Sequence, residues 1–105
     1  MNHDIQWTVD ISTKLKKQLL ELKKSHPKVF DLAIRLFVEM EADGPYRKNW
    51  SHFGPLDKGP GIPEDSYHCH LKNGRPTFVA CWKIEHKSIK IIRVFYVGTH
   101  ENASY

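Results

Sequence analysis

The sequence predicts an α+β domain in which a mostly antiparallel, twisted sheet of about four strands carries an N-terminal helical hairpin on one face. Three observations favour this class. A short segment of alternating polarity comes first, two segments with apolar residues at helical spacing follow, and three segments rich in strand-forming residues come last. The 105 residues suit one domain that covers residues 1–105.

The first predicted strand covers residues 4–11, where apolar and polar residues alternate. Alternation with a period of two is typical of a half-buried strand. Its apolar side consists of Ile5, Trp7, Val9 and Ile11. Ser12 or Thr13 then offers an N-cap for the first predicted helix. Leucines at helical spacing mark the buried side of this helix, namely Leu15, Leu19 and Leu22.

The second predicted helix begins at Pro27, because proline is tolerated at the first helical position and not in a helix interior. Its apolar stripe runs to about Glu41, and Gly44-Pro45 ends it. Two helices joined by so few residues predict an antiparallel hairpin packed on a sheet. Residues 44–64 then hold four of the six prolines and four of the six glycines, which indicates a long irregular loop with a turn or strand near residues 50–53.

Three further strands are predicted at residues 66–72, 76–84 and 88–97. Asn73-Gly74 is a strong hairpin signal between the first two, and residues 85–87 form the next tight turn. The last segment is apolar on both faces, which is typical of a central strand.

Composition narrows the class of protein. Hydrophobic residues make up 40% of the chain and charged residues 27%, values that exclude a disordered chain, a collagen-like fibre and a disulfide-dense mini-protein. The N-terminus has no apolar leader segment, and no run approaches the ~18 apolar residues of a membrane span. We therefore expect a cytoplasmic protein without a membrane partner, in which Cys69 and Cys81 are reduced and buried.

Charge is unevenly distributed along the chain. Residues 1–44 contain seven basic and seven acidic residues, whereas residues 45–105 contain nine basic and five acidic residues and five of the seven histidines. The whole formal charge of +4 therefore lies in the second part. This pattern favours a face for an anionic partner, and the alternative is that basic side chains only keep a small protein soluble.

The motif YHCHLK at residues 67–72 is the first candidate for chemistry. Alternation divides it into two sets, of which Tyr67, Cys69 and Leu71 face the helices and His68, His70 and Lys72 face the other way. Two imidazoles then lie about 7 Å apart on an open face. Because imidazole titrates near neutral pH, such a row suits acid–base catalysis on a phosphodiester. The alternative interpretation is a pair of solvated surface histidines without a role.

A metal site is a second hypothesis for the same motif. His-x-His on a strand can chelate zinc, and His52, His86 or His100 could complete the set. The chain lacks a supporting carboxylate near the pair, and Cys69 is expected to point away from it. We therefore expect no metal and no other cofactor.

The C-terminal residues GTHENASY are the second candidate. Gly98 is expected to permit a sharp turn after the last strand and to bring His100 near the edge of the sheet. The sequence then closes on Tyr105. His100 and Tyr105 are either residues of a loose tail or reactive groups beside the open face.

The order of elements, ending in VGTHENASY, resembles the RelE/ParE superfamily of bacterial toxin–antitoxin toxins. The stretch YHCHLKNGRPTFVACWKI, followed by IIRVFYVGTH, is most similar to the YafQ-like branch. The resemblance covers residues 4–105 and is sharpest over residues 66–105. It implies a RelE/ParE-like fold and a ribosome-dependent mRNA endonuclease, in which the RNA 2′-hydroxyl attacks the adjacent phosphorus without a metal.

The resemblance also implies roles for single residues. His100 is the expected general acid or base, and either His68 or His70 is its partner proton carrier. Tyr105 is expected to stack on a base or to orient the phosphate, and Lys83 to stabilise charge on the phosphate. Lys83 stands where the family usually has an arginine, so it offers a point charge instead of a planar fork. The residues expected to bind nucleic acid are His52, Lys72, Arg75 and Arg93.

The partners implied by the resemblance are a cognate antitoxin and mRNA on the ribosome, with DNA contacted only through an antitoxin complex. Two other functions remain open at this point. One is a non-enzymatic toxin of the ParE type, which poisons DNA gyrase, or an inactive toxin that only binds a partner. The other is a small metal-binding protein.

Overall fold

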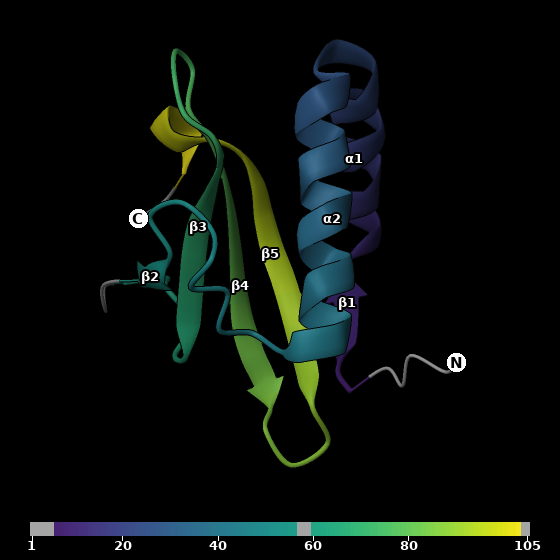
Figure 1. Ribbon diagram of the computed structural model, residues 1–105, viewed down its shortest axis with the longest axis vertical. Coiled ribbons are helices and arrows are strands. Elements are labelled where there is room, and N and C mark those ends of the chain that lie inside the picture. The colour runs from purple at the N-terminus through teal and green to yellow at the C-terminus, as the bar shows by residue number, and fades with distance from the viewer. Residues whose placement is uncertain (1–5, 57–59, 104–105) are drawn as a thin grey trace.

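The computed structural model of the chain describes residues 6–56 and 60–103 and has an α+β fold, as predicted (Figure 1). Its helices are α1 (Thr13–Ser25) and α2 (Pro27–Asp43), and a 3-10 turn, η1, covers His100–Asn102. Its strands are β1 (Thr8–Ile11), β2 (Gly54–Pro55), β3 (Ser66–Lys72), β4 (Phe78–His86) and β5 (Ile91–Thr99). Figure 1 shows both helices on one face of the sheet.

Within the described residues, the sheet is mixed and has five strands in the order β1-β5-β4-β3-β2. The expectation of about four strands was too low, because the loop after α2 contributes the two-residue strand β2, which pairs with β3. Strand β1 runs parallel to β5, with Val9 opposite Ile92, while the other neighbours are antiparallel. Alternation of polarity along a strand carries no information on its direction or partner, so the sequence pattern could not show the parallel pair.

Both helices begin and end at the residues that the sequence marks. The backbone N–H of Leu15 donates to the Ser12 hydroxyl over 3.1 Å, so Ser12 caps α1. Pro27 is the first residue of α2, and Gly44 ends that helix with φ 95°, a left-handed conformation that favours glycine. A Cβ atom at Gly44 would also lie 3.0 Å from the Trp7 indole nitrogen.

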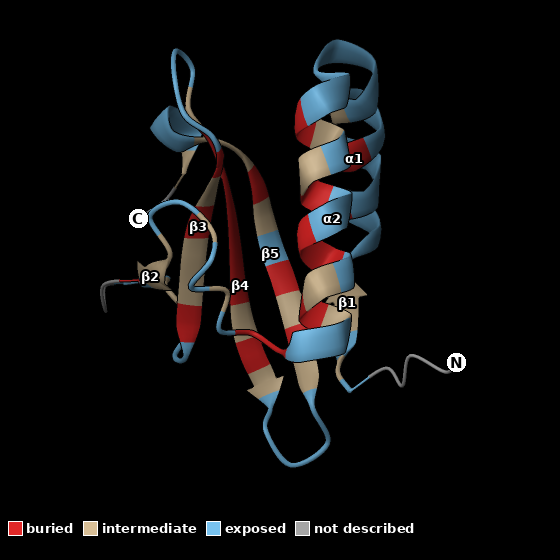
Figure 2. Cartoon of the chain, viewed as in Figure 1, coloured by how far each residue is buried: buried red, intermediate tan, exposed pale blue. Residues whose placement is uncertain are grey.

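The main core lies between the helices and one face of the sheet, where buried residues line the facing sides of both layers (Figure 2). Trp82 of β4 is fully buried and donates its indole N–H to the Pro45 carbonyl over 3.0 Å. Cys69 and Leu71 of β3 belong to this core and Tyr67 packs against it, which confirms the predicted helix-facing side of the YHCHLK motif. Burial raises the pKa of the Cys69 thiol to about 12.

A second, smaller cluster covers part of the opposite face of the sheet. Val79 and Cys81 of β4 are fully buried there with Leu56, and Ile62, Tyr96 and Ala103 pack against them. That face is therefore less open than the sequence pattern suggested, because Leu56, Ile62 and Ala103 lie over it. Cys69 and Cys81 do not form a disulfide, and both are buried, as expected.

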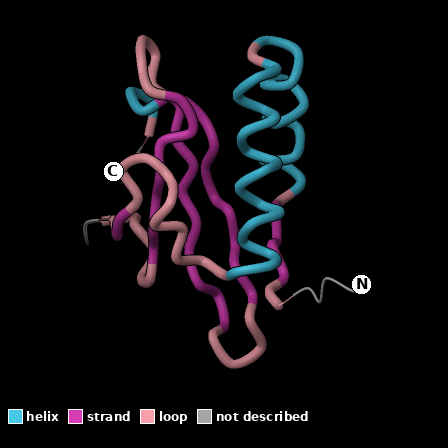
Figure 3. The backbone as a smooth tube through the Cα atoms, viewed as in Figure 1, coloured by secondary structure: helices cyan, strands magenta, loops and turns pink. Residues whose placement is uncertain are grey.

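The loops account for most differences from the predicted boundaries (Figure 3). The connection between β3 and β4 spans residues 73–77 instead of a two-residue turn, since Thr77 Oγ1 donates to the Gly74 carbonyl over 2.8 Å and keeps residue 77 outside the strand. The pairing register also shifts between His70 and Lys72. Strand β4 begins two residues later than predicted and continues to His86, so the next turn covers residues 87–90 instead of 85–87, and β5 begins three residues later than predicted. In residues 6–56 and 60–103, no helix combines the length and apolar character that crossing a membrane requires.

Candidate active site

Four histidines from three parts of the chain meet at one end of the sheet, and we call them the histidine cluster. They are His52, His68, His70 and His100. His70 is the centre of the group, because its ring centroid lies 4.1 Å from that of His52, 6.3 Å from that of His68 and 5.9 Å from that of His100. The structure thus brings together four of the histidines that the sequence singled out.

His68 and His70 come from β3, and a hydrogen bond fixes the tautomer of each neutral ring. His68 Nδ1 donates to the Gly54 carbonyl over 3.1 Å, and His70 Nδ1 donates to Asn73 Oδ1 over 2.6 Å. Burial lowers the pKa of His68 below its usual 6.5, and the neighbouring histidines act in the same direction. The hydrogen bond to Gly54 opposes this shift without cancelling it. His68 therefore favours its neutral form near pH 7.

His52 reaches the cluster because its loop is hydrogen-bonded to the edge of β3. The Ser51 carbonyl accepts the His70 backbone N–H over 2.8 Å, and the Ser51 hydroxyl accepts from Asn73 Nδ2 over 3.0 Å. A hydrogen bond of 2.8 Å also joins that hydroxyl to His52 Nδ1. His52 has φ 57° and lies nearly parallel to the His70 ring, at an interplanar angle of 18°.

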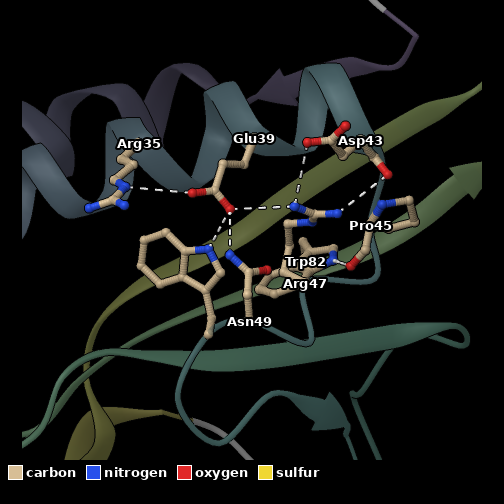
Figure 4. Close-up of polar contacts among 8 residues, drawn as sticks. Arg35, Glu39, Asp43, Pro45, Arg47, Asn49 and Trp82 are labelled. Carbon is tan, nitrogen blue, oxygen red and sulfur yellow. Dashed lines mark hydrogen bonds and ion pairs between the residues drawn. The ribbon is translucent and has the colours of Figure 1, made fainter.

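Upstream of His52, the same loop is anchored to α2 by one carboxylate (Figure 4). Glu39 Oε1 accepts hydrogen bonds from Trp50 Nε1 over 2.8 Å, from Asn49 Nδ2 over 3.0 Å and from an Arg47 guanidinium nitrogen over 3.4 Å. Its other oxygen lies 3.5 Å from Arg35 Nε. Burial acts to raise the pKa of Glu39, but these hydrogen bonds outweigh it and hold the pKa below its usual 4.5. Glu39 therefore stays ionised and holds the loop.

His100 stands directly after β5, at the start of η1. Its backbone N–H donates to the Thr77 carbonyl over 2.8 Å, which ties it to the start of β4. The prediction that Gly98 forms a sharp turn is wrong, since Gly98 lies within β5. A Cβ atom there would lie 2.7 Å from the Tyr96 hydroxyl, which donates to the Thr99 carbonyl over 2.6 Å. Gly98 is thus needed for the close approach of the Tyr96 ring.

Two of the predicted cationic residues belong to a separate group, the ion-pair cluster. It consists of Asp10, Lys83, Glu85 and Arg93. Lys83 lies 2.7 Å from Glu85 and Arg93 lies 2.6 Å from Asp10, measured between the charged atoms. Lys83 is opposite Ser66, and His68 is opposite Cys81, so Lys83 lies diagonally across from His68. Its charge is already balanced within the protein, which the strand sequences did not reveal.

Three other predicted residues lie apart from the cluster or outside the described residues. Alternation placed Lys72 beside His70, but that placement is wrong, because the register shift turns Lys72 toward a hollow that it lines with His26 and Val29 at the start of α2. Arg75 is exposed in the connection between β3 and β4. Tyr105 lies outside the described residues.

Metal binding finds no support in the part of the chain that the structure describes, where no group of three or more histidine, cysteine, aspartate or glutamate residues could hold an ion. His86, a candidate in the metal hypothesis, is exposed at the opposite end of β4 from the residues that contact His100.

The cluster has the parts that proton transfer requires. The ring centroids of neighbouring imidazoles lie 4.1 to 6.3 Å apart, hydrogen bonds select the tautomers of His68 and His70, and the pKa of His68 is lowered. The supporting residues Glu39, Ser51 and Asn73 were missed by the sequence analysis, since each has the polarity of an ordinary surface residue. Searches of protein-family models, curated proteins and solved structures find no match to this chain, so the site's own geometry carries the functional argument.

Proposed function

We propose that the chain is an endoribonuclease that cleaves mRNA on the ribosome and thereby inhibits translation, as the toxin of a type II toxin–antitoxin module with a RelE/ParE-like domain. The observation that carries the proposal is the convergence of His52, His68, His70 and His100 at one end of the sheet. Histidine pairs that can hold and release protons suit cleavage of a phosphodiester without a metal.

The proposed reaction is a transesterification. One imidazole takes the proton from an RNA 2′-hydroxyl, whose oxygen forms a bond to the adjacent phosphorus. The bond from phosphorus to the 5′-oxygen of the next nucleotide breaks, and a second imidazole gives that oxygen a proton. The products are a 2′,3′-cyclic phosphate and a free 5′-hydroxyl.

The environments of the histidines favour a division of labour. His68 is the general base in this scheme, because its lowered pKa leaves it neutral near pH 7. His100 is exposed and is the general acid, and His70 lies beside both rings. Lys83, diagonal to His68, adds positive potential near the phosphate even while it contacts Glu85.

The proposal includes the partners of such a toxin. A cognate antitoxin covers the protein in the cytoplasm, the substrate is mRNA in the ribosomal A site, and DNA is contacted only through the antitoxin complex. The positive net charge of +4 supports attraction to a phosphate backbone.

The test replaces two histidines of the cluster and one outside it. His68→Ala and His100→Ala are each expected to lower mRNA cleavage by about 100-fold or more, because general acid–base catalysis contributes this much. His86→Ala is the matched control, since it removes an exposed imidazole from the far end of β4. Primer extension on cellular mRNA measures cleavage, and circular dichroism checks that each variant is folded.

Cuts by both cluster variants at the parent's rate would contradict the proposal. Growth arrest by the parent without codon-linked cuts, together with DNA breaks trapped on gyrase, would instead indicate the non-enzymatic type of toxin.

A further inference from the structure

A polar hollow of about 260 Å³ adjoins the histidine cluster, between α2, the loop before β2 and the edge of β3. We call it the Arg35 pocket. Its polar and aromatic lining comes from Arg35, Glu39, Asn49, Trp50, Ser51 and His70. Because His70 lines this hollow and is also the centre of the histidine cluster, a chain that crosses the histidines can continue into the pocket.

The lining has the chemistry of a site for a flat aromatic ring. Trp50 contributes an indole whose position is fixed by its 2.8 Å hydrogen bond to Glu39. Arg35 contributes a planar guanidinium whose side chain is 71% exposed and therefore accessible from solvent. Bases of single-stranded RNA stack on aromatic rings and on arginine planes, and such stacking tolerates any base sequence.

The charge of the lining distinguishes between a base and a phosphate. Arg35 and Glu39 contribute one positive and one negative charge, and they are held 3.5 Å apart. A phosphate group would meet the carboxylate as well as the guanidinium, whereas a base is uncharged. The donors of Arg35 and Asn49 and the acceptor oxygens of Glu39 can also hydrogen-bond to the edge of a base.

We propose that the Arg35 pocket holds one base of the RNA strand, next to the phosphate that lies at the histidine cluster. This inference rests on the proposed function for the identity of the RNA. It adds a subsite of its own, in which Arg35 and Trp50 bind the base and Glu39 keeps both in place.

The test measures binding separately from cleavage. The probe is a short single-stranded RNA with 2′-O-methyl groups, which cannot undergo attack by its 2′-oxygen. Fluorescence anisotropy of a labelled probe gives the dissociation constant, and the NMR signal of the Trp50 indole N–H reports whether the pocket is occupied. An abasic strand of equal length separates binding of bases from binding of phosphates.

Three variants sharpen the measurement. Arg35→Ala is expected to weaken binding at least about fivefold, the loss typical of one stacking contact. Arg35→Lys keeps the charge but not the plane, so it is expected to weaken binding to a similar extent. Lys17→Gln is the matched control, because Lys17 is an exposed cation on α1 that does not line the pocket, and it should bind like the parent.

The inference is supported if the probe shifts the Trp50 signal, the abasic strand does not, and both Arg35 variants bind more weakly. It is overturned if the parent does not bind the probe, if Arg35→Ala binds like the parent, or if Arg35→Lys restores full affinity. Primer extension on cellular mRNA decides the proposed function independently. Cleavage without a Trp50 shift would refute the pocket alone, and a Trp50 shift without cleavage would refute only the nuclease.

Discussion

The histidine cluster and the ion-pair cluster adjoin on the same face of the sheet, where Lys83 is diagonal to His68, and both are rich in groups that can be positively charged. In the ion-pair cluster, Lys83 and Arg93 are balanced by Glu85 and Asp10. In the histidine cluster, His68 donates a hydrogen bond to a backbone carbonyl and His70 donates one to an amide oxygen. The charges of the ion-pair cluster have partners inside the protein, whereas the imidazoles of the histidine cluster are groups that can gain or lose a proton.

This difference teaches that counting basic residues overstates how many of them can serve a phosphate. The excess charge of residues 45–105 suggested one continuous anion-binding face. That face holds the histidine cluster, whose imidazoles can change their protonation, and the ion-pair cluster, in which Arg93 of β5 contacts Asp10 of β1 and Glu85 of β4.

The largest effect is expected from detaching the loop that carries His52. Glu39→Gln weakens the charge-assisted hydrogen bonds from Trp50, Asn49 and Arg47, so we expect a loss of about 1–3 kcal/mol in the free energy of unfolding. Urea denaturation measures this loss. Asp43→Asn is the control, because its carboxylate lies 3.9 Å from the same Arg47 but is 66% exposed. Equal losses in the two variants would contradict the anchoring role of Glu39.

An intermediate effect is expected from pH. The pKa of His68 is lowered in the folded protein, so the unfolded chain binds its proton first as the pH falls below about 6.5. The contribution of His68 to the free energy of unfolding should therefore be fully present above that pH and decline below it. Urea denaturation between pH 7.5 and pH 5 measures how the free energy of unfolding changes with pH. The slope should correspond to the uptake of about one proton or less on unfolding.

His68→Asn should flatten this slope, because its amide can still donate to the Gly54 carbonyl but does not titrate. Glu85→Gln should leave it unchanged, because the hydrogen bond from Lys83 lowers the pKa of Glu85 below its usual 4.5 and places that titration in a more acidic range. Glu39 also has a lowered pKa, so its contribution is likewise lost only at lower pH. A slope that persists in His68→Asn would show that another group determines the pH dependence of stability in this range.

The smallest effect is expected in the ion-pair cluster. Asp10→Asn removes a pair whose side chains are 44% and 41% exposed, so it should cost about 0–1 kcal/mol of stability. Lys83→Gln should lower mRNA cleavage less than about tenfold, well below the loss from removing a proton carrier. A loss as large as that of His68→Ala would mean that Lys83 leaves Glu85 and acts on the phosphate.

The sequence predicted local structure well and long-range contacts poorly. Ser12 marks a helix end by its side-chain hydroxyl, and Pro27 and Gly44 do so by their backbone conformations. Alternation also placed Cys69 and Leu71 correctly in the core. Alternation failed at Lys72, because a register shift depends on the partner strand as well as on the strand itself.

The candidate site shows the same limit. His68 and His70 could be recognised as a pair because they lie two residues apart on one strand. His52 joins them only because residues 49–52 bond to α2 and to β3, and neither contact leaves a pattern in the sequence. Site residues that lie on one strand can be recognised in the sequence, whereas site residues that a loop brings in can be recognised only in the folded structure.

The path of that loop has a consequence for the solubility of the protein. A strand at the edge of a sheet presents unpaired backbone groups, to which strands of other molecules can add. Strand β2 covers β3 opposite Tyr67 and His68, and the Ser51 carbonyl caps the backbone N–H of His70. Shortening the loop would therefore do more than displace His52, because it would also expose β3 as a template for aggregation.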